Sequence, residues 1–162
     1  MKPTYEEMIK FMENYFGTYN SYAQNPETVH RMDDYYAPDV LFVPYIFSFG
    51  GPENVLTNRD DFYRTFTDHP ARYEQFEDHD IVVDERRMVA TALLKAALFE
   101  SETEKVLLRK HYLVRYDLGL DENNTLKIKK ILFFWEVVAP ELDAEYGVEK
   151  LEVLRKVGMS GK

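Results

Sequence analysis

The sequence predicts an α+β domain in which helices cover one face of a curved antiparallel sheet. Before residue 70, helical patterns surround a single strand, whereas residues 72–138 carry four runs of strand-forming residues joined by short polar turns. Short connections between consecutive strands produce antiparallel pairs. With 162 residues, of which 45% are hydrophobic, the chain is predicted to form one domain over residues 1–162.

Two helices are predicted at the N-terminal end. Thr4 and Glu7 form a capping-box pattern, and apolar residues then recur every three or four positions over residues 5–22. Asn25 followed by proline is typical of a helix start, which predicts a short second helix that runs as far as Tyr36.

A strand is predicted over residues 41–49, because β-branched and aromatic residues are enriched there. A third helix is expected from Asn58 to Pro70, since its first turn is acidic. The later strands are predicted at residues 72–83, 88–100, 105–117 and 126–138. Residues 140–158 are predicted to form a C-terminal helical extension.

Composition narrows the class of protein. The net charge of −9 argues against nucleic acid and anionic membranes as partners, because phosphates are repelled. The absence of cysteine excludes disulfides and thiolate chemistry. No apolar run is long enough to cross a bilayer and the N-terminus lacks the apolar core of a signal peptide, so a cytoplasmic protein is expected.

Two of the predicted strands, residues 88–100 and 126–138, are apolar on both faces. Helices can cover only one of these faces, so the other is predicted to form a homodimer interface. The face of Ile131, Phe133 and Trp135 is expected to be the one that dimerises. The alternative is that the C-terminal helix covers it.

Three stretches of the chain resemble the SnoaL-like polyketide cyclase branch of the nuclear transport factor 2-like superfamily. They are the residues Tyr-Ala-Pro-Asp-Val-Leu-Phe at 36–42, Asn-Arg-Asp-Asp-Phe at 58–62, and Leu-Lys-Ile with Phe-Trp-Glu-Val-Val between 126 and 138. The resemblance spans roughly residues 5–138. It implies a cone-shaped, cystatin-like fold, in which a curved sheet surrounds an apolar cavity, and usually a dimer.

The resemblance also implies a site. The acid/base carboxylate of similar cyclases corresponds to Glu136, and their polar partner to Tyr112. Burial among rings is expected to raise the pKa of Glu136 into the range useful for proton transfer. The alternatives are that Glu136 is solvent-exposed or pairs with Lys110 or Lys130, and that Tyr112 is only a core residue. His111 is the reserve candidate for the base, because a one-residue register error exchanges the faces.

Two mechanisms of the same superfamily are not expected. The position of the basic aspartate of ketosteroid isomerases is Val43, and the position of the histidine of scytalone-dehydratase-like enzymes is Gln75. The residues predicted to line the pocket are Tyr15, Tyr19, Lys110, Tyr116 and Phe134.

The function expected from these residues is action on, or binding of, a small apolar molecule. One hypothesis is a cyclase, isomerase or dehydratase of a carbonyl-bearing substrate that needs no cofactor, with a tyrosine stabilising the enolate. The other is a non-catalytic module that binds a small ligand or a protein. No metal is expected, since no H-x-H or H-E-x-x-H motif occurs.

Overall fold

The computed structural model describes residues 2–23, 27–45, 55–68 and 70–136. In these ranges a five-stranded sheet has the order β1-β5-β4-β3-β2. The pairs β2–β3, β3–β4 and β4–β5 are antiparallel, and β1 runs parallel to β5. The strands are β1 (Tyr36–Tyr45), β2 (Arg72–Asp84), β3 (Val89–Glu100), β4 (Val106–Leu120) and β5 (Leu126–Trp135).

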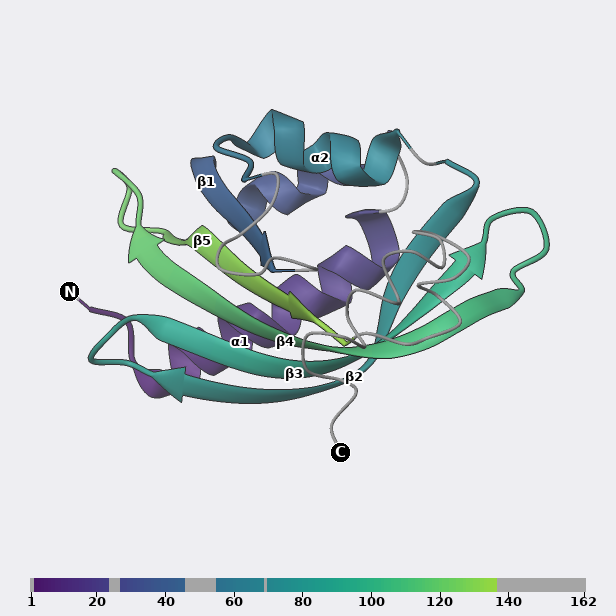
Figure 1. The fold of residues 1–162 in the computed structure, drawn as a ribbon. Helices are drawn as coiled ribbons and strands as arrows, with labels where there is room; N and C mark the ends of the chain where they lie inside the picture. The colour runs from purple at the N-terminus through teal and green to yellow at the C-terminus, as the bar shows by residue number, and fades with distance from the viewer. Residues whose placement is uncertain (1, 24–26, 46–54, 69, 137–162) are drawn as a thin grey trace, which may run out of the picture.

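Four helical segments accompany the sheet within the described ranges. They are α1 (Tyr5–Thr18), a π-helical turn η1 (Tyr19–Ala23), a 3-10 helix η2 (Val29–Asp34) and α2 (Arg59–Thr67). Figure 1 shows that β2, β3 and β4 curve beneath α1 and that α2 lies on the same side of the sheet. The predicted α+β class, with helices on one face of a curved sheet, is therefore confirmed. The sheet is mixed and not wholly antiparallel as predicted, because β1 pairs in parallel with β5.

The predicted starts of the first and third helices agree with the structure. The Thr4 hydroxyl accepts a hydrogen bond from the Glu7 main-chain N–H, and the Glu7 carboxylate accepts one from the Thr4 N–H. At α2, the Asn58 side-chain oxygen accepts the Asp61 N–H at 2.9 Å. Each side chain satisfies a main-chain donor that the helix itself leaves unpaired.

The second predicted helix is only a 3-10 turn, and Tyr36 begins β1 instead of ending a helix. Tyr36 pairs with Ile128 of β5, so the strand starts earlier than residue 41. Pro38 explains part of this difference, because a proline disfavours helical backbone in the residue before it. The predicted residues 46–49 and the helical extension at 140–158 lie outside the described residues.

The core lies between α1 and the concave face of the sheet. Met8, Met12 and Phe16 of α1 are buried there. The facing residues of β3 include Ala90, Ala92 and Ala96, which are 0–1% exposed. Small side chains at alternate positions of β3 fill little of the space beneath the helix, so bulky side chains of α1 can pack directly over the strand.

The convex face of the sheet also carries apolar residues, as the two-faced pattern predicted. Leu93 pairs with Leu113, which pairs with Phe134, and these side chains are 49%, 51% and 43% exposed. The face assigned to the dimer was wrong, because Ile131 and Phe133 belong to the concave side and contribute to the core. Alternation shows which residues share a face but not which face points inward when both are apolar.

Candidate functional site

A cavity of about 100 Å³ lies on the concave face of the sheet. Cavities of this order take up benzene-sized molecules in other proteins. Among the described residues its wall is mostly aromatic and contains a single carboxylate, Glu74 of β2. The lining residues are Tyr15, Tyr19, Phe42, Phe62, Glu74, Phe76, Leu94, Val114, Tyr116, Ile131 and Phe133.

Glu74 reaches the cavity because β2 places it on the same face as Phe76, two residues further along the strand. Both of its oxygens accept hydrogen bonds from tyrosines. The Tyr19 hydroxyl donates to Oε1 at 3.1 Å, and the Tyr112 hydroxyl donates to Oε2. Removal from water raises the pKa of Glu74 above its ordinary value, and the Tyr112 bond, the Lys110 charge and the Tyr19 bond offset only part of that rise.

Lys110 of β4 supplies the positive charge beside this carboxylate. Its side chain is 5% exposed, and its Nζ lies 3.2 Å from the centre of the Trp135 ring. The face of the indole attracts the ammonium group, so Trp135 fixes the lysine in a partly dehydrated position. Glu74, Tyr19, Tyr112, Lys110 and Trp135 together form what we call the Glu74 cluster.

The helical turn that follows α1 positions Tyr19 of this cluster. At η1 the helix changes from α to π geometry, which turns Tyr19 toward Glu74 and Asn20 toward the free edge of β2. The Asn20 amide donates to the Phe76 carbonyl at 2.9 Å, and its oxygen accepts the Phe76 N–H at 2.8 Å. Asn20 therefore pairs with the edge strand as another strand would.

We expect Asn20→Ala to destabilise the protein by about 1–3 kcal/mol, because it leaves the main-chain N–H and C=O of Phe76 without these partners. Chemical denaturation of the variant and of wild type measures the difference. Asn14→Ala, at an exposed position of α1, is the matched control and should change stability by less than about 0.5 kcal/mol. Equal effects at the two positions would contradict the role of Asn20.

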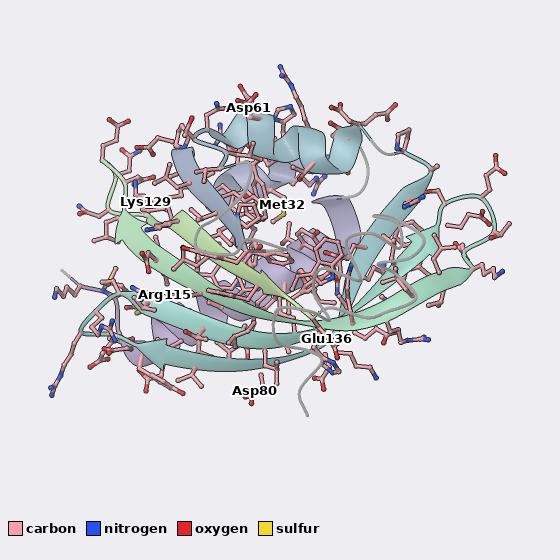
Figure 2. The ribbon with its side chains drawn as sticks, in the orientation of Figure 1. Met32, Asp61, Asp80, Arg115, Lys129 and Glu136 are labelled. Carbon is pink, nitrogen blue, oxygen red and sulfur yellow. The ribbon has the colours of Figure 1, made fainter. Side chains whose placement is uncertain are left out.

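Glu136 does not face the cavity. It follows β5 directly (Figure 2), and its side chain is 45% exposed. Its Oε2 accepts the His111 main-chain N–H at 2.6 Å and lies 3.0 Å from His111 Nδ1. These two hydrogen bonds lower the pKa of Glu136 below its ordinary value. The predicted burial and raised pKa of Glu136 are therefore wrong, and its partner is His111 instead of Lys110 or Lys130.

Since the folded-state pKa of Glu136 is lowered, its ionised form stabilises the fold above the pKa of the unfolded chain. That contribution is lost as the pH falls through the folded-state value. Glu136→Gln should therefore cost less than about 1 kcal/mol at pH 7, because the pair is largely exposed, and less again at pH 3. Melting curves at both pH values measure this, with Glu122→Gln in an exposed turn as the control.

The other predicted site residues divide between the two faces. Tyr15, Tyr19 and Tyr116 line the cavity. Tyr112 is buried on the concave side and donates its hydroxyl to Glu74, while Lys110 is buried against Trp135. His111 points outward with Glu136, and Phe134 lies on the convex face, so neither lines the cavity.

Glu74 was missed because no motif marks it. The resemblance drew attention to the neighbouring Gln75, which takes the position of the histidine of scytalone-dehydratase-like enzymes. The signal available was alternation in Tyr73-Glu74-Gln75-Phe76, where a carboxylate shares a face with an aromatic residue. Residues 72–83 are otherwise so polar that alternation alone does not identify an inward face.

Two further findings bear on the site. Within the described ranges, no three His, Asp or Glu side chains gather closely enough to hold a metal ion. Over the same part of the chain, no helix has both the length and the apolar character needed to cross a membrane.

Comparison with known proteins identifies the fold. No family model matches the sequence, and no curated protein matches it. Solved structures do match. BvnE pinacolase from Penicillium brevicompactum is 18% identical, with a TM-score of 0.58 and coverage of 94% of both chains. A nuclear transport factor 2-like protein from Anabaena variabilis is 14% identical, with a TM-score of 0.59 and coverage of 85% of this chain and 96% of that one.

A third structure, a candidate polyketide cyclase from Xanthomonas campestris, is 12% identical, with a TM-score of 0.58 and coverage of 80% of this chain and 90% of its own. At these identities the likeness concerns the fold. The chain has the nuclear transport factor 2-like fold, and the resemblance inferred from the sequence is confirmed at that level.

Proposed function

We propose that the cavity binds a small, uncharged, largely apolar molecule and that Glu74 moves a proton on it, as in a cyclase, isomerase or dehydratase. The observation that carries this proposal is a carboxylate with a raised pKa in an aromatic cavity. A desolvated carboxylate is a stronger base than one in water, and a pKa closer to neutrality suits it to give the proton back. The polyketide cyclase and pinacolase names among proteins of the same fold agree with such chemistry.

The uncharged character of the ligand follows from electrostatics. Glu74 and Lys110 already balance one another, and the lining residues that the structure describes, other than Glu74, carry no formal charge. An anionic ligand would bring its charge close to Glu74 in a medium that screens poorly, which opposes binding. Catalysis would then begin with the Glu74 carboxylate accepting a proton from the bound molecule.

The second candidate is a binding module without catalysis. One observation favours it: both Glu74 oxygens are already hydrogen-bonded to tyrosines, an arrangement that also stabilises a purely structural carboxylate. The two candidates share the cavity and differ in whether Glu74 exchanges its proton with a ligand.

Binding itself is tested with ethylbenzene and benzoate, an uncharged and an anionic probe of similar size, by ligand-observed NMR. We expect ethylbenzene to bind and benzoate to bind at least about tenfold more weakly, since an unpaired charge is costly to bury. Val114→Phe, which fills the cavity, should abolish ethylbenzene binding, whereas Val82→Phe at a 67% exposed position should not. Failure of ethylbenzene to bind the wild-type protein would refute the proposed function.

A further inference from the structure

The cavity is nearly closed to solvent. Of the 11 described residues that line it, eight are 8% exposed or less, and Phe42, Glu74 and Phe133 are half-buried. The Phe42 ring contacts that of Phe133, with ring centres 5.8 Å apart, and stacks on that of Phe62 at 4.7 Å. Phe62 of α2 therefore closes the cavity beside its half-buried rings, and a benzene-sized ligand needs part of the wall to move before it can enter.

The elements of the wall differ in how firmly they are held. Hydrogen-bonded ladders join the strands, and α1 is fixed by Met8, Met12 and Phe16, which are 1% exposed or less. α2 has nine residues, a length at which a helix is marginal in water without tertiary contacts, and it packs mainly against β1 (Figure 1). Elements with few buried contacts open more readily than the rest of a fold, so α2 is the part of the wall most able to move.

The polar side of α2 is fastened through one carboxylate, that of Asp33 in η2. The Tyr63 hydroxyl donates to Asp33 Oδ1 at 2.5 Å, and the Arg59 Nε lies 3.2 Å from the same oxygen. Asp33 is itself fixed, because the Lys127 Nζ donates to the Asp33 and Asp34 carbonyl oxygens at 2.9 and 2.8 Å and so joins η2 to β5. Burial and the Asp33 bond raise the pKa of Tyr63 above its ordinary value, so this hydroxyl remains a donor.

We propose that α2 is the wall that moves to admit a ligand, and that Tyr63 and Asp33 are the positioning residues that hold it closed. The inference rests on the proposed function, since it assumes that the cavity takes up a ligand. Tyr63 directly follows Phe62, so the bond that fixes Tyr63 against η2 also fixes the neighbouring ring at the cavity. When α2 moves outward, this hydrogen bond and the stacking of Phe62 on Phe42 break together, and both form again when it closes.

This arrangement separates the rate of ligand exchange from the affinity. Tyr63 and Asp33 are not among the described residues that line the cavity, so a bound ligand does not touch them. The closed state is present both before and after binding, so the Tyr63 bond contributes equally to the free and the bound protein and cancels in the dissociation constant. Only the open state lacks this bond. Weakening it therefore makes opening more frequent and accelerates entry and release by the same factor.

The test measures the association and dissociation rate constants of ethylbenzene by ligand-observed NMR relaxation dispersion. Tyr63→Phe should raise both rate constants about tenfold, the value of a hydrogen bond to a charged group, and should change the dissociation constant less than about twofold. Arg64→Gln is the matched control, because the Arg64 side chain is 69% exposed and pairs with Asp61 of the same helix at 3.4 Å. Its rate constants should stay within about twofold of those of wild type.

Hydrogen exchange of the ligand-free wild-type protein covers the case in which Tyr63→Phe does not fold. The main-chain amides of α2 should exchange at least about tenfold faster than those in the middle of α1, because α2 opens without the rest of the fold. Unchanged rate constants in Tyr63→Phe, a change in its dissociation rate constant alone, equal changes in Arg64→Gln, or α2 amides that exchange as slowly as those of α1 would each overturn the inference. These results would leave the proposed function standing. Only a failure of ethylbenzene to bind wild type would overturn both.

Discussion

Replacing Glu74 with glutamine is expected to slow enzyme-catalysed exchange of the methyl protons of acetophenone in D₂O by about 10²–10⁴-fold, the usual contribution of a general base. The amide cannot accept the proton, although it occupies nearly the same volume and still forms hydrogen bonds with tyrosine hydroxyls. Acetophenone affinity should therefore change little while the exchange rate falls. Proton NMR follows the loss of the methyl signal over time.

Glu136→Gln is the matched control for this experiment, since it makes the same substitution at the carboxylate that the sequence favoured. Because Glu136 is exposed and bonded to His111 outside the cavity, its variant should exchange at the wild-type rate. If Glu136→Gln lost exchange and Glu74→Gln retained it, the base would be Glu136 and the assignment to Glu74 would be wrong. Wild-type protein that binds acetophenone without accelerating exchange would favour the binding module.

The pH dependence of stability gives an independent check on Glu74. Its pKa is raised on folding, so the unfolded chain ionises first as the pH rises above about 4.5. The fold therefore loses stability between the unfolded-state pKa and the folded-state pKa, and the loss persists at higher pH. Glu74→Gln lacks this loss, so its stability relative to wild type should be greater at pH 8 than at pH 4. If the free energies of unfolding of Glu74→Gln and wild type differed by the same amount at both pH values, the environment of Glu74 would not disfavour its charge.

We propose that the convex face of the sheet pairs with the same face of a second copy of the chain. Leu93, Leu113 and Phe134 form an exposed apolar row across three strands. Two arginines on the same face are paired with carboxylates. Arg109 binds both oxygens of Glu77, and Arg115 binds Asp117, each at 2.9 Å. These two ion pairs are neutral, so they do not oppose the approach of a second copy of the face.

Sedimentation of wild-type protein at micromolar concentration should give about twice the chain mass of 19.2 kDa. Leu113→Glu should weaken this dimer at least about 100-fold, because each copy then brings an unpaired carboxylate into a dry interface. Tyr5→Glu, at a 47% exposed position of α1, is the control and should remain dimeric. A monomeric wild-type protein, or a Leu113→Glu variant that dimerises normally, would refute the proposal.

Local sequence signals account for most of the elements. The Thr4 capping box, the acidic first turn after Asn58 and the polar turns between strands each act over a few residues, so the sequence contains the whole interaction. The order of elements was likewise enough to predict the α+β class. The exceptions, such as the early start of β1 at Tyr36, arise where pairing with a distant strand outweighs local preference.

The sequence by itself determined which residues share a face, and it therefore placed Tyr112, Val114 and Tyr116 together, opposite His111. It did not determine which face points inward, because β3 and β5 are apolar on both sides. Only the packing of α1 and α2 on the sheet decided that Ile131 faces the cavity while Phe134 faces solvent. The same packing, with the π turn at Tyr19, made the carboxylate of Glu74 rather than Glu136 the desolvated one, since burial depends on contacts between residues far apart in the chain.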